Sequence, residues 1–277
     1  LTVKKKITPF KKTISIDPDK SISIRSFIIG SVSQKISYAK NILESEDVFS
    51  TIKCLKKLGV KIEKKEKGNY LIYGKGLGSL FASKNAELNF GNSGTLARLL
   101  VGMLSTTPNI EITIKGDHSL NKRNMKKLID LMSQFGAEFT PKNKFFFPLQ
   151  ISSTNFPIGI TYQSGTSAQL KSAVILAGLN SYGHTEIVEH LKSRNHTENM
   201  IKKNKQAINI SNGNVKKIKV FGKQNLDKFS INIPGDPSSA AFFTALTLLK
   251  KNSSLKIKNV GLNPTRIGFY YLLKKSG

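Results

Sequence analysis

The sequence predicts a repeated α/β fold, and three observations support this prediction. Four corners rich in small and polar residues each lead into an apolar helical pattern, at nearly equal steps along the chain. A second helical pattern follows each corner. Runs rich in β-branched residues, bounded by turn formers, lie between and after these helices.

The four corners come in order along the chain. They read DPDKSISIRSFIIGS (17–31), FGNSGTLARLLVGML (90–104), QSGTSAQLKSAVILAGL (163–179) and PGDPSSAAFFTALTLL (234–249). If Ser21, Ser93, Ser167 and Ser238 are equivalent, the steps are 72, 74 and 71 residues. The second helices are predicted over 46–60, 121–137, 196–207 and 263–277.

Strands are predicted where β-branched residues concentrate, over 69–74, 110–116, 217–222, 229–233 and 254–260. One unit is therefore a strand, a helix, a strand, a helix and a strand pair. A period of this length exceeds the roughly 20–50 residues of common solenoids and favours α/β modules around a shared core. The chain begins with Leu1 and stops at Gly277, just after a second helix, so we expect a fragment cut within a repeat.

The formal net charge of +27 is the strongest compositional feature. Its direct interpretation is nucleic-acid binding. The lysines, however, are scattered along the whole chain, which favours a general drift in composition. The five arginines are more informative, because a guanidinium binds carboxylate or phosphate through two hydrogen bonds. They are Arg25, Arg98, Arg123, Arg194 and Arg266.

The single cysteine, Cys54, excludes a disulfide scaffold and argues against a cysteine-based metal site. The four histidines lack the paired spacing of a zinc helix. No segment approaches the roughly 18 apolar residues of a membrane span. The basic start of the chain is followed by no apolar signal segment. We therefore expect a cytoplasmic protein without a metal, a membrane anchor or a nucleic-acid partner.

Several corners combine cationic side chains with small residues that expose backbone N–H groups, an arrangement that favours anions. Hydroxyl and acidic residues also cap helices, so any single corner has a purely structural interpretation. The residues that make the corners chemically distinctive are Lys20, Ser21, Arg25, Asn92, Gly94, Thr95, Arg123, Ser167, Ala168, Gln169, Lys171 and Arg194. Together they predict one site for a polyanionic ligand.

The motifs DKSISIRS, GNSGTLAR, GDHSLNKR, SGTSAQLKSAVILAGL, SRNHTE and PGDPSSAAFF…NPTR run along almost the whole chain. With them the sequence resembles the 5-enolpyruvylshikimate-3-phosphate (EPSP) synthase family. The resemblance implies the enolpyruvyl-transferase fold, with two domains of three βαβαββ units each. Residues 20–235 would form one complete three-unit domain. Residues 1–19 and 236–277 would form part of the other.

The resemblance also implies a transferase of aromatic amino-acid biosynthesis that needs no cofactor or metal and acts as a monomer. The family moves the enolpyruvyl group of phosphoenolpyruvate to the 5-hydroxyl of shikimate 3-phosphate and releases phosphate. Domain closure around the substrates excludes water.

Site residues carry over by motif. The implied shikimate 3-phosphate ligands are Lys20, Ser21, Arg25, Ser167, Ala168, Gln169 and Arg194. The implied phosphoenolpyruvate ligands are Lys20, Asn92, Gly94, Thr95, Arg123 and Gln169. Lys20 is the one candidate for proton transfer. Gly94 implies sensitivity to glyphosate in an intact protein, and we expect Arg98 and Arg266 to form structural ion pairs.

The sequence departs from the family pattern at Pro18, Ile24 and Asn124, which puts the fine geometry of the corners in question. The acidic proton acceptor and the Lys-Glu pair of the family match nothing in this sequence, and the resemblance places them beyond Gly277. A general base must reach the proton it removes. We therefore expect residues 1–277 alone to have no turnover.

Two alternatives remain. The first is a UDP-N-acetylglucosamine enolpyruvyl transferase of the same fold, many of which use a loop cysteine. Cys54, however, lies in a helical pattern with Leu55 and Leu58, which favours a buried thiol. The second is a basic nucleic-acid-binding module, which needs lysines clustered on one face with interleaved aromatic residues.

Overall fold

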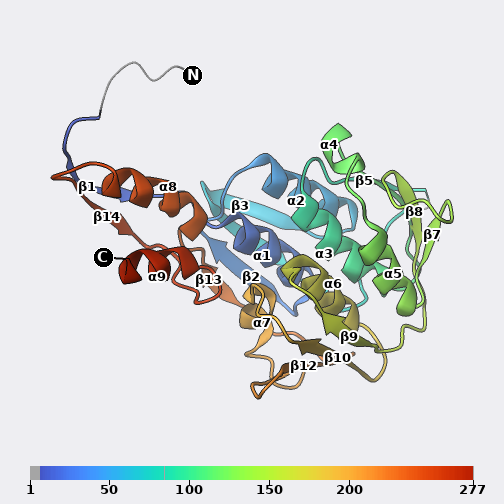
Figure 1. Ribbon diagram of the computed structural model, residues 1–277. Helices are drawn as coiled ribbons and strands as arrows, with labels where there is room; N and C mark the ends of the chain where they lie inside the picture. Colours follow the sequence, from blue (N-terminus) through green and yellow to red (C-terminus); the bar gives the residue numbers. More distant parts are fainter. Residues whose placement is uncertain (1–6, 84, 277) are drawn as a thin grey trace.

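The computed structural model describes residues 7–83 and 85–276, in which three four-stranded mixed sheets surround a central group of helices and a two-stranded sheet lies at one end. Figure 1 shows α1, α3 and α6 in the middle of the molecule, whereas β1, β14, α8 and α9 gather at one end.

Two sequence predictions involve residues outside this description. The basic start of the chain, at residues 1–6, lies outside the described residues. So does Gly277, the last residue of the helix predicted over 263–277 and the residue beyond which the resemblance places the remaining catalytic groups. Catalytic residues beyond Gly277 therefore stay a prediction, and Lys20 is the one catalytic candidate that the structure describes.

The elements follow the predicted repeat. The first repeat holds α1 (Lys20–Val32), β2 (Ile36–Lys40), α2 (Glu46–Lys57), β3 (Ile62–Glu66) and β4 (Asn69–Tyr73). The second holds β5 (Glu87–Asn89), α3 (Gly94–Ser105), β6 (Glu111–Lys115), α4 (His118–Asn121), α5 (Lys126–Gln134), β7 (Glu138–Thr140) and β8 (Leu149–Ser152). The third holds β9 (Thr161–Ser164), α6 (Ala168–Leu179), β10 (His184–Glu189), α7 (His196–Ile201), β11 (Ile208–Ser211) and β12 (Lys216–Phe221). The remaining elements are β1 (Lys11–Ser15), β13 (Ser230–Asn232), α8 (Pro237–Leu248), β14 (Ser254–Lys258) and α9 (Gly268–Lys275).

The three four-stranded sheets share one topology, which confirms the predicted βαβαββ unit. Their strand orders are β5-β6-β8-β7, β9-β10-β12-β11 and β13-β2-β4-β3. In each sheet the first two strands are parallel and the others antiparallel. Parallel strands need a crossover connection. α3 supplies it between β5 and β6, and α6 supplies it between β9 and β10. α1 covers the sheet that contains the parallel pair of β13 and β2.

In two units, the strand that precedes the first helix in the sequence pairs within the sheet of the other unit. β1 leads directly into α1, but it pairs in parallel with β14, from Lys11↔Ser254 to Ser15↔Lys258. β13 leads into α8, but it pairs in parallel with β2. The two connections run side by side, and the Asp236 N–H donates to the Asp17 carbonyl at 2.9 Å. No local signal in the sequence indicates this exchange.

Each of the four main helices begins at a side-chain N-cap. The caps are Asp19, Ser93, Ser167 and Asp236, and each accepts a hydrogen bond from a backbone N–H of the first turn. The predicted equivalence of Ser21 and Ser238 with the other two serines is therefore wrong by two residues. An aspartate caps α1 and α8, where a serine caps α3 and α6.

The second helices are shorter than predicted. The helix expected over 121–137 is reduced to α5, since α4 already ends at Asn121. The Asn124 side chain accepts the Lys126 N–H at 2.8 Å, just where α5 begins. α7 ends at Ile201, where the Asn204 side chain binds the Ile201 carbonyl at 3.2 Å. α9 begins only at Gly268, after a turn.

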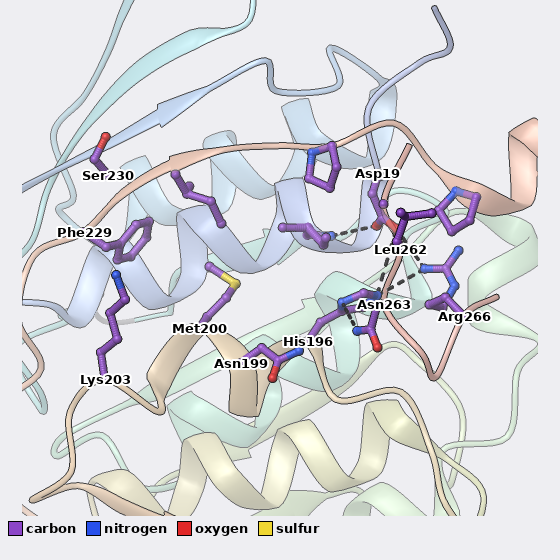
Figure 2. A pocket seen from close by; sticks show the side chains of 15 residues that line it. Asp19, His196, Asn199, Met200, Lys203, Phe229, Ser230, Leu262, Asn263 and Arg266 are labelled. Carbon is purple, nitrogen blue, oxygen red and sulfur yellow. Dashed lines mark hydrogen bonds and ion pairs between the residues drawn. The ribbon is translucent and has the colours of Figure 1, made fainter. Parts of the chain in front are cut away.

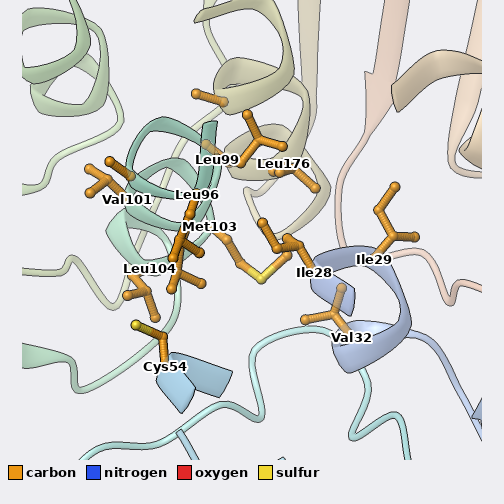
Figure 3. Packing of buried hydrophobic residues seen from close by; sticks show 14 of the residues in the cluster. Ile28, Ile29, Val32, Cys54, Leu96, Leu99, Val101, Met103, Leu104 and Leu176 are labelled. Atoms are coloured by element: carbon orange, nitrogen blue, oxygen red, sulfur yellow. The ribbon is translucent and has the colours of Figure 1, made fainter. Parts of the chain in front are cut away.

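The hydrophobic core lies where α1, α3 and α6 meet (Figure 3). Ile28 of α1, Leu99 of α3 and Leu176 of α6 are all at most 1% exposed. Cys54 of α2 reaches the edge of this core, and its thiol donates to the Asn89 carbonyl at 3.4 Å. Burial raises the pKa of the Cys54 thiol to about 12. The expected buried thiol is confirmed, and such a thiol is inert as a nucleophile.

Gly102 sets how closely α3 approaches α6. A Cβ at this position would lie 2.6 Å from the Ala173 carbonyl oxygen and 2.7 Å from its Cα. Backbone atoms of a packed helix cannot move aside cheaply, so Gly102→Ala should lower the free energy of unfolding by about 1–3 kcal/mol. Chemical denaturation followed by circular dichroism measures this effect.

Gly268→Ala is the matched control, because a Cβ there would have no heavy atom within 4 Å. This substitution should leave the stability unchanged or raise it by less than about 1 kcal/mol. Equal stability of the two variants would show that the α3–α6 contact is looser than described.

Candidate functional site

The candidate site lies at the N-terminal ends of α1, α3 and α6. The first-turn N–H groups of a helix have no intrahelical partner and carry part of the positive end of the helix dipole. Asp19, Ser93 and Ser167 each satisfy one of these groups. The Gly94 N–H donates to the Asn92 carbonyl at 3.1 Å, and the other first-turn N–H groups can still bind an anion.

Arg25 joins α1 to α6 and α7. Its guanidinium donates from Nε to Thr197 Oγ1 at 2.9 Å and from Nη2 to Ser172 Oγ at 3.0 Å. Nη1 donates to the hydroxyl and the carbonyl of Ser21, at 3.0 and 3.1 Å. Arg25 is only 2% exposed, so these contacts fix the group within the protein. Predicted residues Ser21 and Arg25 therefore act as one unit.

Gln169 joins α6 to α3, because its side-chain amide donates to Thr95 Oγ1 at 3.0 Å. Ser167 and Ala168 precede it at the start of α6. Arg123 is brought back to the start of α3 by a hydrogen bond to the Asn92 side chain. The structure thus brings together the predicted residues from 92 to 95, Arg123 and Gln169.

Two arginines converge on Gly94. A Cβ at Gly94 would lie 2.8 Å from Arg123 Nη1 and 2.9 Å from Arg98 Nη1. Arg98 also donates to the Gly94 carbonyl at 3.0 Å. Burial, and then the charge of Arg123, lower the pKa of Arg98.

Arg98 was expected to form an ion pair, but within residues 7–83 and 85–276 it has no carboxylate partner. Sequence reasoning therefore missed Arg98 as a member of this cationic group. The signal was available, because Arg98 lies one helical turn after Gly94 in GNSGTLAR.

Lys20 and Arg194 flank the site with more exposed charge. Lys20 Nζ pairs with Asp47 of α2 at 2.8 Å, and its side chain is 50% exposed. This exposed pair is weak enough to open for a ligand. Arg194 is exposed on the loop before α7, the helix whose Thr197 binds Arg25.

A buried ion cluster lies behind Arg25. Lys171 of α6 pairs with Glu189 at 2.6 Å and with Glu198 at 2.7 Å, and all three side chains are at most 1% exposed. Lys216 approaches the same carboxylates at 2.8 and 3.5 Å. Glu189 also accepts both the N–H and the hydroxyl of Ser193, at 3.0 and 2.8 Å. The cluster therefore holds the loop that carries Arg194.

Arg266 bridges the junction of the two connections. It donates to Asp19 at 2.8 Å and to Asp236 at 2.7 Å, the N-caps of α1 and α8. The expected structural ion pair of Arg266 is confirmed. His196 Nε2 lies 3.2 Å from the same guanidinium. Burial, followed by the charges of the neighbouring arginines, lowers the pKa of His196 to about 3, so His196 is neutral at pH 7.

The comparisons with known proteins fit this geometry. The family model described as EPSP synthase (3-phosphoshikimate 1-carboxyvinyltransferase) matches residues 4–277. The chain belongs to the EPSP synthase family.

Two curated relatives are both named 3-phosphoshikimate 1-carboxyvinyltransferase. The one from Novosphingobium aromaticivorans is 40% identical over 272 residues, which cover 97% of this chain and 61% of the relative. The one from Bacillus cytotoxicus is 42% identical over 268 residues, or 96% of this chain and 61% of the relative. The chain therefore spans about 61% of the length of these relatives.

Solved EPSP synthases share the fold. The structure of EPSP synthase from Acinetobacter baumannii superposes with a TM-score of 0.85 at 35% sequence identity. The match covers 96% of this chain and 59% of that one. The enolpyruvyl-transferase fold expected from the sequence is confirmed.

A separate cavity of about 330 Å³ lies beside the junction and not at the helix corners (Figure 2). Asp19, Asn263 and Arg266 stand at one end of it, and Lys203 and Phe229 at the other. None of the residues that the EPSP synthase resemblance implies as ligands lines this cavity. We therefore place the candidate site at the corners, where the arginines and the helix N-termini meet.

The described residues contain no group of three or more histidine, cysteine, aspartate or glutamate side chains arranged to hold a metal ion. In the same part of the chain, no helix has the length and apolar character needed to cross a membrane. The buried thiol of Cys54 does not lie in a loop at the corners, which counts against the sister UDP-N-acetylglucosamine enzymes.

Proposed function

We propose that this chain supplies the shikimate 3-phosphate site and part of the phosphoenolpyruvate site of an EPSP synthase. In this reaction C3 of phosphoenolpyruvate is protonated, the 5-hydroxyl of shikimate 3-phosphate adds to C2, and the intermediate loses phosphate. One observation carries the proposal. Three helix corners far apart in sequence are joined by the Arg25–Ser172 and Gln169–Thr95 contacts into one cationic surface.

The α1 and α6 corners are the proposed shikimate 3-phosphate grip. Arg25 is held by neutral hydroxyls, so its positive charge stays available to an anionic ligand. The first-turn N–H groups of α6, beside Ser167 and Ala168, add a second anion-binding feature. Arg194 and Lys20 are proposed to close on the ligand from the exposed side.

The α3 corner is the proposed phosphoenolpyruvate grip. Arg123 and Arg98 present two guanidinium groups beside Gly94, where a doubly charged phosphate would receive fixed hydrogen bonds. Gln169 belongs to the first turn of α6, and its bond to Thr95 links that turn to the α3 corner. We propose that Gln169 contacts both ligands, and that Lys20 takes part in proton transfer.

Two domains remain part of the proposal, with residues 20–235 as a three-repeat domain and residues 1–19 with 236–277 as part of another. Large apolar side chains of the second part face solvent, among them Phe242 at 79%, Leu249 at 85% and Leu272 at 64% exposure. An apolar surface of this kind is typical of a face that another polypeptide covers. A monomeric, cytoplasmic enzyme belongs to the same proposal.

Gly94→Ala tests the phosphoenolpyruvate grip. The added methyl would meet both guanidinium groups below 3 Å and push them apart, since they are the flexible ends of their side chains. We expect phosphoenolpyruvate and glyphosate to bind about tenfold more weakly in the presence of shikimate 3-phosphate, as for the loss of one charged hydrogen bond. Fluorescence titration measures both ligands, and unchanged affinity for both would place them elsewhere.

Calorimetric titration with shikimate 3-phosphate tests the function. We expect saturable 1:1 binding that weakens as salt rises, because charged groups carry it. We also expect no phosphate release from the two substrates, because no acidic residue of the chain fills the family's proton-acceptor motif. Product formed by purified residues 1–277 would contradict the second expectation, and absence of binding would contradict the first.

A further inference from the structure

Arg25 is a buried charge whose direct partners are all neutral. Among the described residues no carboxylate contacts its guanidinium, and three hydroxyls and one carbonyl accept its N–H groups. Burial lowers the pKa of Arg25 to about 10, and the more distant charges of Glu198 and Asp19 offset part of this shift. Arg25 is still charged at pH 7. A buried guanidinium without a contacting counter-ion is set up to receive an anion.

Two neighbouring contacts join α6 to α7 beside Arg25. The Thr197 hydroxyl donates to Ser172 Oγ at 2.8 Å, and Lys171 pairs with Glu198 at 2.7 Å. Consecutive residues of α6 thus meet consecutive residues of α7. The Ser172 hydroxyl in turn donates to the Ala168 carbonyl in the first turn of α6, at 2.7 Å.

These hydrogen bonds fix the direction in which each of the two hydroxyls donates its proton. Thr197 gives its proton to Ser172, so its lone pairs face Arg25 Nε. Ser172 gives its proton to Ala168, so its lone pairs face Thr197 and Arg25 Nη2. A hydroxyl has one donor and two acceptor positions, and here the chain of donors runs away from the guanidinium.

We infer that Ser172 and Thr197 are positioning residues, which hold the Arg25 guanidinium in the orientation that binds shikimate 3-phosphate. The Lys171–Glu198 ion pair keeps the two hydroxyls in register. The inference rests on the proposed function, because it assigns Arg25 to that ligand. Neither hydroxyl needs to touch the substrate.

The test compares Thr197→Val with Thr197→Ser in the whole chain. Valine keeps the shape of threonine but removes the acceptor for Nε, so shikimate 3-phosphate should bind about 10- to 100-fold more weakly, the range for a hydrogen bond to a charged group. Serine restores the hydroxyl and should keep the affinity within about threefold of the original chain. Ser172→Ala removes the second acceptor and should weaken binding in the same direction.

Thr107→Val is the matched control, since Thr107 is also a buried threonine, with its hydroxyl on the Met103 carbonyl at 2.9 Å. It should not change the affinity. The double variant Ser172→Ala with Thr197→Val should lose less than the product of the two single losses, because the two hydroxyls share a bond. The NMR signal of Arg25 Nε–H should be sharp in the original chain and in Thr197→Ser, and broadened in Thr197→Val.

The outcomes separate the two proposals. If the original chain does not bind shikimate 3-phosphate, the proposed function is wrong and this inference is wrong with it. If the original chain binds and folded Thr197→Val and Ser172→Ala bind equally well, only the inference is wrong. Loss of affinity in both variants with recovery in Thr197→Ser supports it.

Discussion

Replacing Lys171 with methionine is expected to lower the free energy of unfolding by about 3–5 kcal/mol, the range for breaking a buried ion pair by removing one partner. Lys171 is fully buried between Glu189 and Glu198. Without its ammonium group, two buried carboxylates would depend on Lys216 alone, whose Nζ lies 2.8 Å from one and 3.5 Å from the other. Guanidinium denaturation followed by circular dichroism measures the loss.

Two further variants define what this result means. Lys126→Met removes an exposed ion pair with Asp130, with side chains 54% and 48% exposed, and should change stability by less than about 1 kcal/mol. Lys171→Met with Glu198→Leu removes one charge of each sign and should recover part of the loss. If Lys171→Met is as stable as Lys126→Met, the buried cluster does not carry the charges described.

The Lys171→Met effect should depend on pH. Burial alone would raise the pKa of Glu189, but hydrogen bonds from Lys171, Lys216 and Ser193 outweigh burial and lower it to about 2 from the ordinary 4.5. Glu189 therefore stabilises the folded chain fully above pH 4.5, and this contribution fades as the pH falls toward 2. The difference between the original chain and Lys171→Met should shrink over the same interval.

Replacing Arg25 with alanine is expected to weaken shikimate 3-phosphate binding by about 100-fold or more, because the charged hydrogen bond to the ligand and the positive charge beside it are lost together. Arg25→Lys should recover little of this affinity. A lysine ammonium is a point charge and cannot occupy the positions of Nε, Nη1 and Nη2 at once. Isothermal titration calorimetry measures both variants.

Arg123→Ala is the matched control for this prediction. Arg123 lies at the α3 corner, so its loss should reduce the affinity for phosphoenolpyruvate but leave that for shikimate 3-phosphate within about threefold, since the two arginines contact separate corners. Equal losses of shikimate 3-phosphate affinity in Arg25→Ala and Arg123→Ala would show a general electrostatic effect and not a specific grip.

The repeat and its helices could be predicted from sequence because they depend on local signals. Small and polar corners, apolar helical periodicity and β-branched runs recur at near-equal steps, and the three four-stranded sheets follow them. The exchange of β1 and β13 could not be predicted in the same way. Both are short strands whose partners, β14 and β2, are chosen by packing across the molecule and not by neighbouring residues.

The candidate site was predictable only in part. Arg25 and Gln169 were identified from their motifs, but Ser172 and Thr197 were missed, because hydroxyl residues in helices are common and carry little signal. Lys171 was grouped with the cations of the corners, but it is fully buried and pairs with Glu189 and Glu198 instead. A lysine within the mostly apolar helix AQLKSAVILAGL can be buried only if carboxylates from other elements reach it.

An amide NMR titration of the chain with shikimate 3-phosphate tests most directly whether the separate corners form one site. We expect the signals of Ser21, Ala168 and Arg194 to shift together, at a single dissociation constant and a 1:1 ratio. Shifts confined to the cavity lined by Met200 and Phe229, or different dissociation constants at the different corners, would contradict a common site.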